Sequence, residues 1–158
     1  MKSFVLNLVI AVIWLFLSKQ PSTGVFFIGF FLGFVMIAAF SALLDGGDYP
    51  RRCLAVTRFV GMFAVDFVKA NLSVARTVLF ERRESLHPDF ITYDISGMRR
   101  GEILLLSYCI TLTPGTTTVN VSEDFRTLVV HALDADAPEA IRRQIDRRLR
   151  QPILKFTR

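Results

Sequence analysis

PSTGVFFIGFFLGFVMIAAFSALL, residues 21–44, is the strongest structural signal in the sequence. None of its 24 residues carries a charge. About 20 apolar residues are enough for a helix to cross the hydrocarbon of a bilayer. We therefore expect a membrane-spanning helix here. Gly29 and Gly33 form a Gly-x-x-x-Gly pair within it, and this pair offers a smooth face for the close packing of another helix.

A second uncharged run, residues 3–18, comes just before it. As a helix these residues measure about 24 Å, so they span only if the ends snorkel or the bilayer thins locally. Trp14 and Lys19 suit an interfacial anchor and a snorkelling ammonium group. A cleaved signal peptide is the alternative, but no small-x-small cleavage site follows. Residues 1–44 are thus predicted to form a transmembrane helical hairpin whose turn, residues 19–24, lies at the far interface.

The net charge of +5 is unevenly distributed along the chain. Residues 51–88 carry seven basic and three acidic side chains, directly after the predicted hairpin. Basic residues in this position meet anionic lipid headgroups, whereas nucleic-acid binding lacks an accompanying groove-reading motif. Because Arg51, Arg52 and Arg58 outnumber the single Lys19 in the outer turn, we expect both termini to be cytoplasmic.

The middle segment, residues 45–88, is predicted to contain a loop at 45–52 and a long amphipathic helix at 54–80. Polar positions recur in the helix every three or four residues and form one stripe. Such a helix lies in the membrane interface or packs obliquely on a partner, and a third membrane span is the alternative. Asp66 is a candidate for an ion path. It can also pair locally with Lys69 on a wet helix face.

Residues 89–158 are predicted to form a small cytoplasmic α+β domain with the element order β-α-β-β-α. The expected elements are a strand at 90–95, a buried helix at 99–112, strands at 117–121 and 127–133, and a final helix that includes Pro138. Periodicity alone leaves a strand open as the alternative for 99–112. Asp134 and Asp136 are expected to cap the final helix.

Thr113-Pro114-Gly115-Thr116 breaks the chain in the middle of this domain. Proline at the second and glycine at the third position favour a type II turn. The neighbouring threonine hydroxyls are then expected to satisfy backbone groups rather than to take part in chemistry.

The sequence contains no motif on which catalysis could rest. A P-loop, a Gly-x-Gly-x-x-Gly sequence, a nucleophile elbow and a metal-spaced set of cysteines and histidines are all absent from it. His87 and His131 belong to no recognisable set, and Cys53 and Cys109 are expected to be reduced and structural. We expect neither catalytic residues nor a metal site nor a cofactor, and the chain is not expected to be an enzyme.

The sequences LSYCITLTPGTTTVNVS at 106–122 and LVVHALD at 128–134 resemble the E-type subunits of the multisubunit monovalent cation/proton antiporters, the Mrp type, also called Mnh or Pha. The predicted hairpin and the basic amphipathic region occur in matching order. The resemblance implies an accessory subunit of a bacterial inner-membrane complex that exchanges Na+ or K+ for protons and supports pH and salt homeostasis. Conduction in such complexes is assigned to large subunits, so no catalytic residue carries over. Residues 113–116 carry over as a family signature with a structural role.

The leading functional hypothesis is a multi-pass subunit that acts in assembly and stability rather than in conduction. Its expected partners are the other membrane subunits and the lipid bilayer, and nucleic acid is not expected to bind. The alternative is a membrane-tethered cytoplasmic domain that binds a ligand or regulates a partner.

Overall fold

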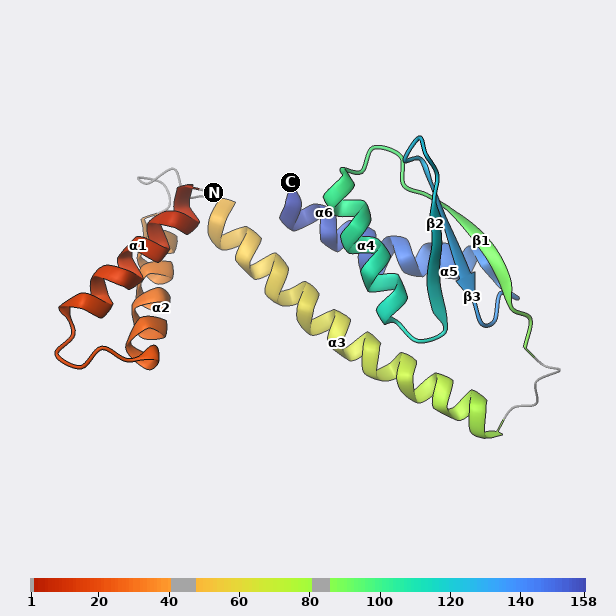
Figure 1. The fold of residues 1–158 in the computed structure, drawn as a ribbon, viewed down its shortest axis with the longest axis horizontal. Coiled ribbons are helices and arrows are strands. Elements are labelled where there is room, and N and C mark those ends of the chain that lie inside the picture. Colours follow the sequence, from red (N-terminus) through yellow and green to blue (C-terminus); the bar gives the residue numbers. More distant parts are fainter. Residues whose placement is uncertain (1, 41–47, 81–85) are drawn as a thin grey trace. The chain divides into compact units, whose positions relative to one another are not determined.

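A computed structural model describes residues 2–40, 48–80 and 86–158 (Figure 1). The chain divides into two compact units, Met1–Leu54 and Ala55–Arg158. Helix α3 (Asp48–Phe80) begins in the first unit and continues through the second. The functional division into residues 1–44, 45–88 and 89–158 stays a prediction.

The first unit is a helical hairpin of α1 (Lys2–Leu17) and α2 (Thr23–Ala39). The Ser22 hydroxyl begins α2 by accepting the Val25 N–H at 3.3 Å. Gly29 and Gly33 are buried, and a Cβ atom added at Gly29 would lie 2.8 Å from Trp14 Cβ. The glycine pair therefore lets α1 approach α2 closely, as the motif predicts, and the helix packed on it is the neighbour within the same hairpin.

One polar side chain, Asn7, is fully buried in this hairpin. Its Nδ2 donates to the hydroxyl of Tyr49 at 2.9 Å, and its Oδ1 faces Gly33 without a hydrogen-bond partner among the described residues. A side chain at residue 33 would occupy the position of that oxygen. The pattern of apolar runs did not indicate this contact, because Asn7 is a single polar residue among hydrophobic neighbours.

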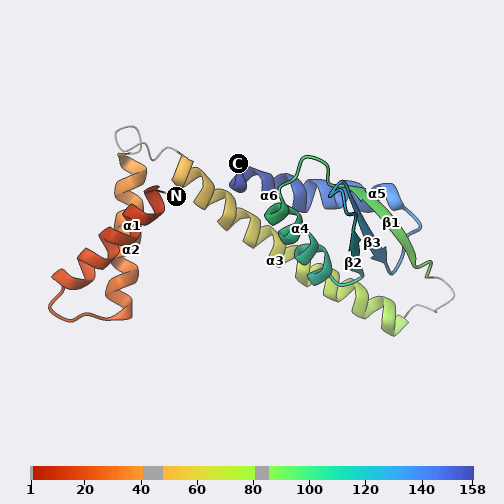
Figure 2. The same cartoon turned by 45° about the horizontal axis from the view of Figure 1, so that its top comes forward.

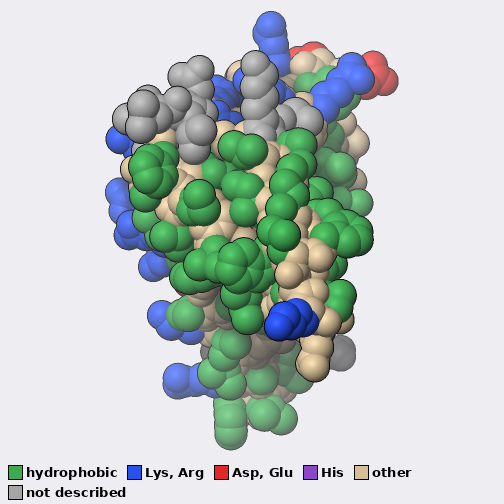
Figure 3. Space-filling view, turned by 90° about the vertical axis from the view of Figure 1, so that its left-hand side faces the viewer, with side chains coloured by type: hydrophobic (Ala, Val, Ile, Leu, Met, Phe, Trp, Pro, Cys, Tyr) green, Lys and Arg blue, Asp and Glu red, His purple; other side chains and the backbone are tan. Residues whose placement is uncertain are grey.

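Hydrophobic side chains cover the face of the hairpin shown in Figure 3. Many are more than half exposed, with Phe16 at 81% and Phe31 at 65%. Neither α1, α2 nor any other helix in the described ranges combines the length and apolar character that a membrane crossing requires. The prediction of two spanning helices is accordingly not confirmed, and the final residues of the predicted span, 41–44, lie outside the described residues.

Helix α3 starts earlier than the sequence pattern suggested. Residues 48–52 are helical, so the predicted loop at 45–52 is wrong from Asp48 onward, while residues 45–47 lie outside the described part of the chain. Pro50 is compatible with this start because the first turn of a helix does not need the missing N–H. Further along, Phe59 is buried in the core of the second unit, and its ring centroid lies 5.6 Å from that of Phe156 with the two rings tilted.

The second unit contains a three-stranded antiparallel sheet in the order β1-β3-β2, made of β1 (Asp89–Asp94), β2 (Thr116–Val121) and β3 (Thr127–Ala132). In the central strand Leu128, Val130 and Ala132 alternate with less buried residues, so one face of the sheet faces the core. The predicted α+β class and the β-α-β-β-α order are confirmed for this unit. Each edge strand is hydrogen-bonded to a side chain of a neighbouring helix. On β2 the Thr118 N–H donates to Thr111 Oγ1 of α4 (Arg100–Leu112) at 3.2 Å, and on β1 the Thr92 carbonyl accepts from Arg142 Nε of α5 (Pro138–Ile145) at 2.9 Å.

Helix α4 (Arg100–Leu112) lies between α3 and β2 (Figures 1 and 2). Residues at helical spacing, Ile103, Leu106 and Ile110, are buried, so the strand alternative for this segment is wrong. Helices α5 (Pro138–Ile145) and α6 (Gln151–Thr157) join through the π-helical turn η2 (Asp146–Arg150) into one rod. The wider turn precedes Pro152, which lacks the N–H needed to continue a regular α-helix.

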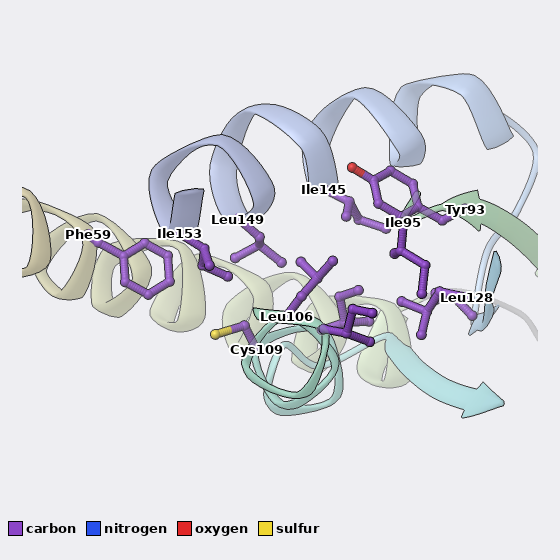
Figure 4. Close-up of a cluster of buried hydrophobic side chains, with 12 residues drawn as sticks. Phe59, Tyr93, Ile95, Leu106, Cys109, Leu128, Ile145, Leu149 and Ile153 are labelled. Atoms are coloured by element: carbon purple, nitrogen blue, oxygen red, sulfur yellow. The ribbon is translucent and has the colours of Figure 1, made fainter. Parts of the chain in front are cut away.

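The core of the second unit forms where α3, α4, the strands and this C-terminal rod meet (Figure 4). Fully buried residues include Ile95, Leu106, Leu128 and Ile153. Ile145 and Leu149 of the C-terminal rod belong to the same cluster. The predicted caps of the last helix, Asp134 and Asp136, are wrong, because the N-cap residue of α5 is Ala137 and no side chain caps this end of the helix.

Candidate functional site

A half-open cavity of about 570 Å³ lies in the second unit between α3, the turn after α4 and the C-terminal rod. It is lined by both groups of residues that the sequence singled out, Asp66 on α3 and the turn Thr113–Thr116, together with Lys69, Ser73, Gln144 and Arg148. These segments are up to 82 positions apart in the chain, so only the fold brings them together. Apolar residues also line the cavity, among them Phe63, Val74 and Ile145.

The turn has the predicted shape. Gly115 has φ +92°, and the Thr116 N–H donates to the Thr113 carbonyl at 3.3 Å. Each threonine hydroxyl donates to backbone: Thr113 to the Cys109 carbonyl at 2.8 Å, and Thr116 to the Ile110 carbonyl at 3.0 Å. The hydroxyl protons are therefore engaged in closing the end of α4, which supports a structural role for this signature.

Replacing Gly115 by valine is expected to destabilise the second unit by about 1 to 3 kcal/mol. A β-branched residue is strained at positive φ, whereas space is not the obstacle: an added Cβ would lie 3.5 Å from Val74 Cγ2, an ordinary contact. Protease resistance of the purified chain is the measurement. Gly101→Val, where nothing lies within 4 Å of the added Cβ, is the control. Equal resistance of the two variants would refute the turn argument.

Asp66 is a quarter exposed and pairs with Arg148, whose NH1 lies 3.8 Å from its Oδ2. The expected local pair with Lys69 is replaced by this long-range one. Asp66 lines the half-open cavity and faces the C-terminal rod, and both the ion path and the wet helix face stay predictions for it. The pair joins α3 to η2 across the cavity.

A second acidic residue, Glu102, is buried at the start of α4 with only 3% of its surface exposed. Its carboxylate accepts the Arg99 N–H at 2.8 Å, the Thr157 hydroxyl at 2.8 Å and the Arg158 NH2 at 3.2 Å. Burial by itself would raise the pKa of Glu102, but these bonds and the Arg158 charge outweigh it and lower the pKa to about 2. Glu102 is therefore ionised in the folded chain, and its hydrogen bonds to Thr157 and Arg158 connect the start of α4 to the C-terminal rod.

The structure also brings together His87, Asp134 and Asp136, whose candidate ligand atoms lie within 4.8 Å of one another. His87 Nδ1 lies 3.0 Å from Asp136 Oδ1, and both side chains are largely exposed. The two aspartates were expected to cap a helix and instead face this histidine. His131 packs edge-on against Phe90 at 5.2 Å. The expectation that no metal binds stays a prediction.

Sequence reasoning missed Glu102, Arg148 and Arg158 as the residues that carry the buried and bridging charges. A signal for Glu102 was present: an acidic residue in the first turn of an otherwise apolar helix matches the positive end of the helix dipole. The two arginines gave none, because the last helix holds several arginines that look alike in sequence.

Comparison with known proteins points in one direction. The family of Na+/H+ ion antiporter subunits matches the chain over residues 7–156. The E1 subunit of the Na+/H+ antiporter of Staphylococcus epidermidis is 32% identical over 136 residues, covering 86% of this chain and 85% of that protein. The E1 subunit of the Staphylococcus aureus antiporter is 33% identical over 135 residues, covering 85% and 84%.

Two solved structures share the fold. A chain of the membrane-bound sulfane sulfur reductase, an archaeal respiratory membrane complex, matches with a TM-score of 0.58 and 24% identity over 96% of this chain and 98% of that one. A chain of the Mrp complex from Dietzia matches with a TM-score of 0.51 and 23% identity over 65% and 96%. The family match spans nearly the whole chain, including the hairpin from Asn7, the cavity and the threonine turn, and the protein therefore belongs to the Na+/H+ ion antiporter subunit family.

Proposed function

We propose that this chain is an accessory subunit of a multisubunit monovalent cation/proton antiporter complex, acting in assembly and stability rather than in conduction. The proposal rests on the distribution of apolar and polar side chains in the hairpin. Its outward side chains are apolar, and its interior holds one fully buried polar residue, Asn7, among the residues described. Two helices packed this closely provide no aqueous path of their own, so their outer surface is available to lipid and to larger subunits.

The cation is Na+ by analogy with the named relatives, and K+ is the competing cargo. The hairpin inserts into a bacterial inner membrane with both termini in the cytoplasm. Helices of 16 and 17 residues measure about 24 to 26 Å, so insertion requires snorkelling ends or a locally thinned bilayer. An impermeant thiol reagent applied to intact spheroplasts should fail to label a cysteine placed at Gln151, and labelling there would overturn this topology.

The role in assembly is tested by omitting this chain from cells that express the rest of the complex. We expect the amount of complex recovered in mild detergent to fall, while cation/proton exchange per recovered complex in vesicles stays within about twofold. Exchange that disappears from a fully assembled complex would assign this protein to conduction. Recovery of the chain as a free monomer would favour the alternative, a membrane-tethered binding domain, for which the 570 Å³ cavity is the supporting feature.

Asp66→Asn is expected to leave both exchange and assembly intact. The pair with Arg148 is long and partly exposed, so its loss is expected to cost about 0.2 to 1 kcal/mol. Arg148→Gln, which removes the other partner, serves as the control and should behave in the same way. Lost exchange in Asp66→Asn alone, with normal recovery of the complex, would place Asp66 on a proton route.

A further inference from the structure

One face of α3 packs on the second unit, and the opposite face is apolar and exposed. Phe59 is 7% exposed on the inward side, while the outward hydrophobic residues are not covered by the rest of the second unit. More than half of the surface is exposed for Val60, Val65, Val68, Leu72, Val78, Leu79 and Phe80. An apolar face of this length on an otherwise folded unit indicates a contact with lipid or protein.

A row of basic residues runs along the edge of this apolar face. Arg58, Lys69 and Arg76 are separated by 11 and 7 residues, which at 3.6 residues per turn are close to three and two whole turns. All three are exposed, and among the described residues none has an ion-pair partner. They therefore form one line of positive charge about 27 Å long beside the apolar face.

The outward side of α3 carries no negative charge to oppose this row. Asp66 is the single acidic residue between Tyr49 and Phe80, and it faces the cavity and Arg148. An apolar strip beside a purely basic row complements a surface that is apolar below and anionic above. An anionic phospholipid leaflet has that layered chemistry.

We propose that α3 lies flat on a membrane that contains anionic phospholipids, with its outward apolar face at the acyl boundary and Arg58, Lys69 and Arg76 against headgroup phosphates. This goes beyond the proposed antiporter role and does not depend on it. A spanning orientation fits the residues poorly, because Lys69 would lie near the middle of the hydrocarbon. It would also draw Asp66 and the polar lining of the cavity out of water.

Spin labels on the full-length chain test this placement. In a background with Cys53→Ser and Cys109→Ala, labels are attached through Gly61→Cys, Val68→Cys and Leu79→Cys, which lie on one line along the exposed face of α3, and through Tyr108→Cys on the exposed side of α4 as the aqueous reference. The chain is reconstituted in vesicles of phosphatidylcholine with one quarter phosphatidylglycerol. Accessibility to oxygen and to a water-soluble nickel chelate gives the depth of each label.

A flat helix predicts similar, shallow immersion of all three α3 labels, with the label at residue 108 in water. A gradient of depth that is deepest at residue 68 would show a spanning helix and overturn the proposal. Nickel accessibility at all three labels would overturn it as well and leave this face to a protein partner. Because the labels report local depth, the result stands whether or not the hairpin holds the protein on the vesicle.

The charge requirement is tested by replacing Arg58, Lys69 and Arg76 together by glutamate. The matched control makes the same change at three exposed arginines elsewhere in the second unit, Arg126, Arg143 and Arg147. Each basic residue near an anionic surface strengthens binding by about fivefold, so the α3 variant should lose its phosphatidylglycerol-dependent immersion and the control should keep it. Equal immersion of both variants, each with a wild-type circular dichroism spectrum, would refute the role of the basic row.

Discussion

Glu102→Ala is expected to destabilise the second unit by about 2 to 4 kcal/mol, the largest effect of any single polar substitution proposed for this chain. The change removes a carboxylate with 3% exposure and leaves the Arg99 N–H, the Thr157 hydroxyl and the Arg158 guanidinium without their acceptor. Hydrogen exchange of amides in residues 100–112 and 127–132 of the full-length chain measures the loss. Glu139→Ala on α5, an exposed glutamate that pairs with Arg142, is the control and should change protection by less than about 0.5 kcal/mol.

The same carboxylate makes stability depend on acid. The pKa of Glu102 is about 2 in the folded chain against an ordinary 4.5, so its stabilisation is fully present above about pH 4.5. It is lost as the pH falls toward 2, because protonation removes the charge that Arg158 contacts. The stability gap between wild type and Glu102→Gln should therefore narrow from about pH 6 to about pH 2. A gap that stays constant over that range would contradict the assignment of Glu102 as a buried anion.

Gly29→Val should separate the two helices of the hairpin at a cost of about 1 to 3 kcal/mol. A Cβ atom at this position would lie 2.8 Å from Trp14 Cβ and 2.9 Å from Trp14 Cγ, and the indole must move to admit the side chain. Trp14 is the single tryptophan of the chain, so its emission reports the hairpin alone. We expect a shifted emission maximum and a lower thermal midpoint in detergent.

Gly24→Val is the matched control on the same helix, since its added Cβ would lie 3.8 Å from the Ser22 hydroxyl, an ordinary contact. It should leave the Trp14 emission unchanged. If Gly29→Val also left both the emission and the thermal midpoint unchanged, the close approach of α1 and α2 at Gly29 would be refuted.

Local patterns in the sequence predicted most elements of the second unit. The sheet strands, α4 and the turn at Gly115 follow from β-branched runs, apolar helical spacing and the Pro-Gly pair, all of which act over a few neighbouring residues. The start of α3 and the cap of α5 were wrong. Pro50 and the aspartates before Pro138 are compatible with more than one local structure, and packing decided between them.

Periodicity and short motifs were enough to predict most elements of the second unit, the apolar helical hairpin and the resemblance to the antiporter subunits, because these signals act over a few neighbouring residues. Folding determined which partners the charged side chains contact. It placed Asp66 against Arg148 and enclosed Glu102 with Thr157 and Arg158. The physical reason is that a charge is stabilised by whichever partner folding brings within a few ångströms, and that partner can lie far away along the chain.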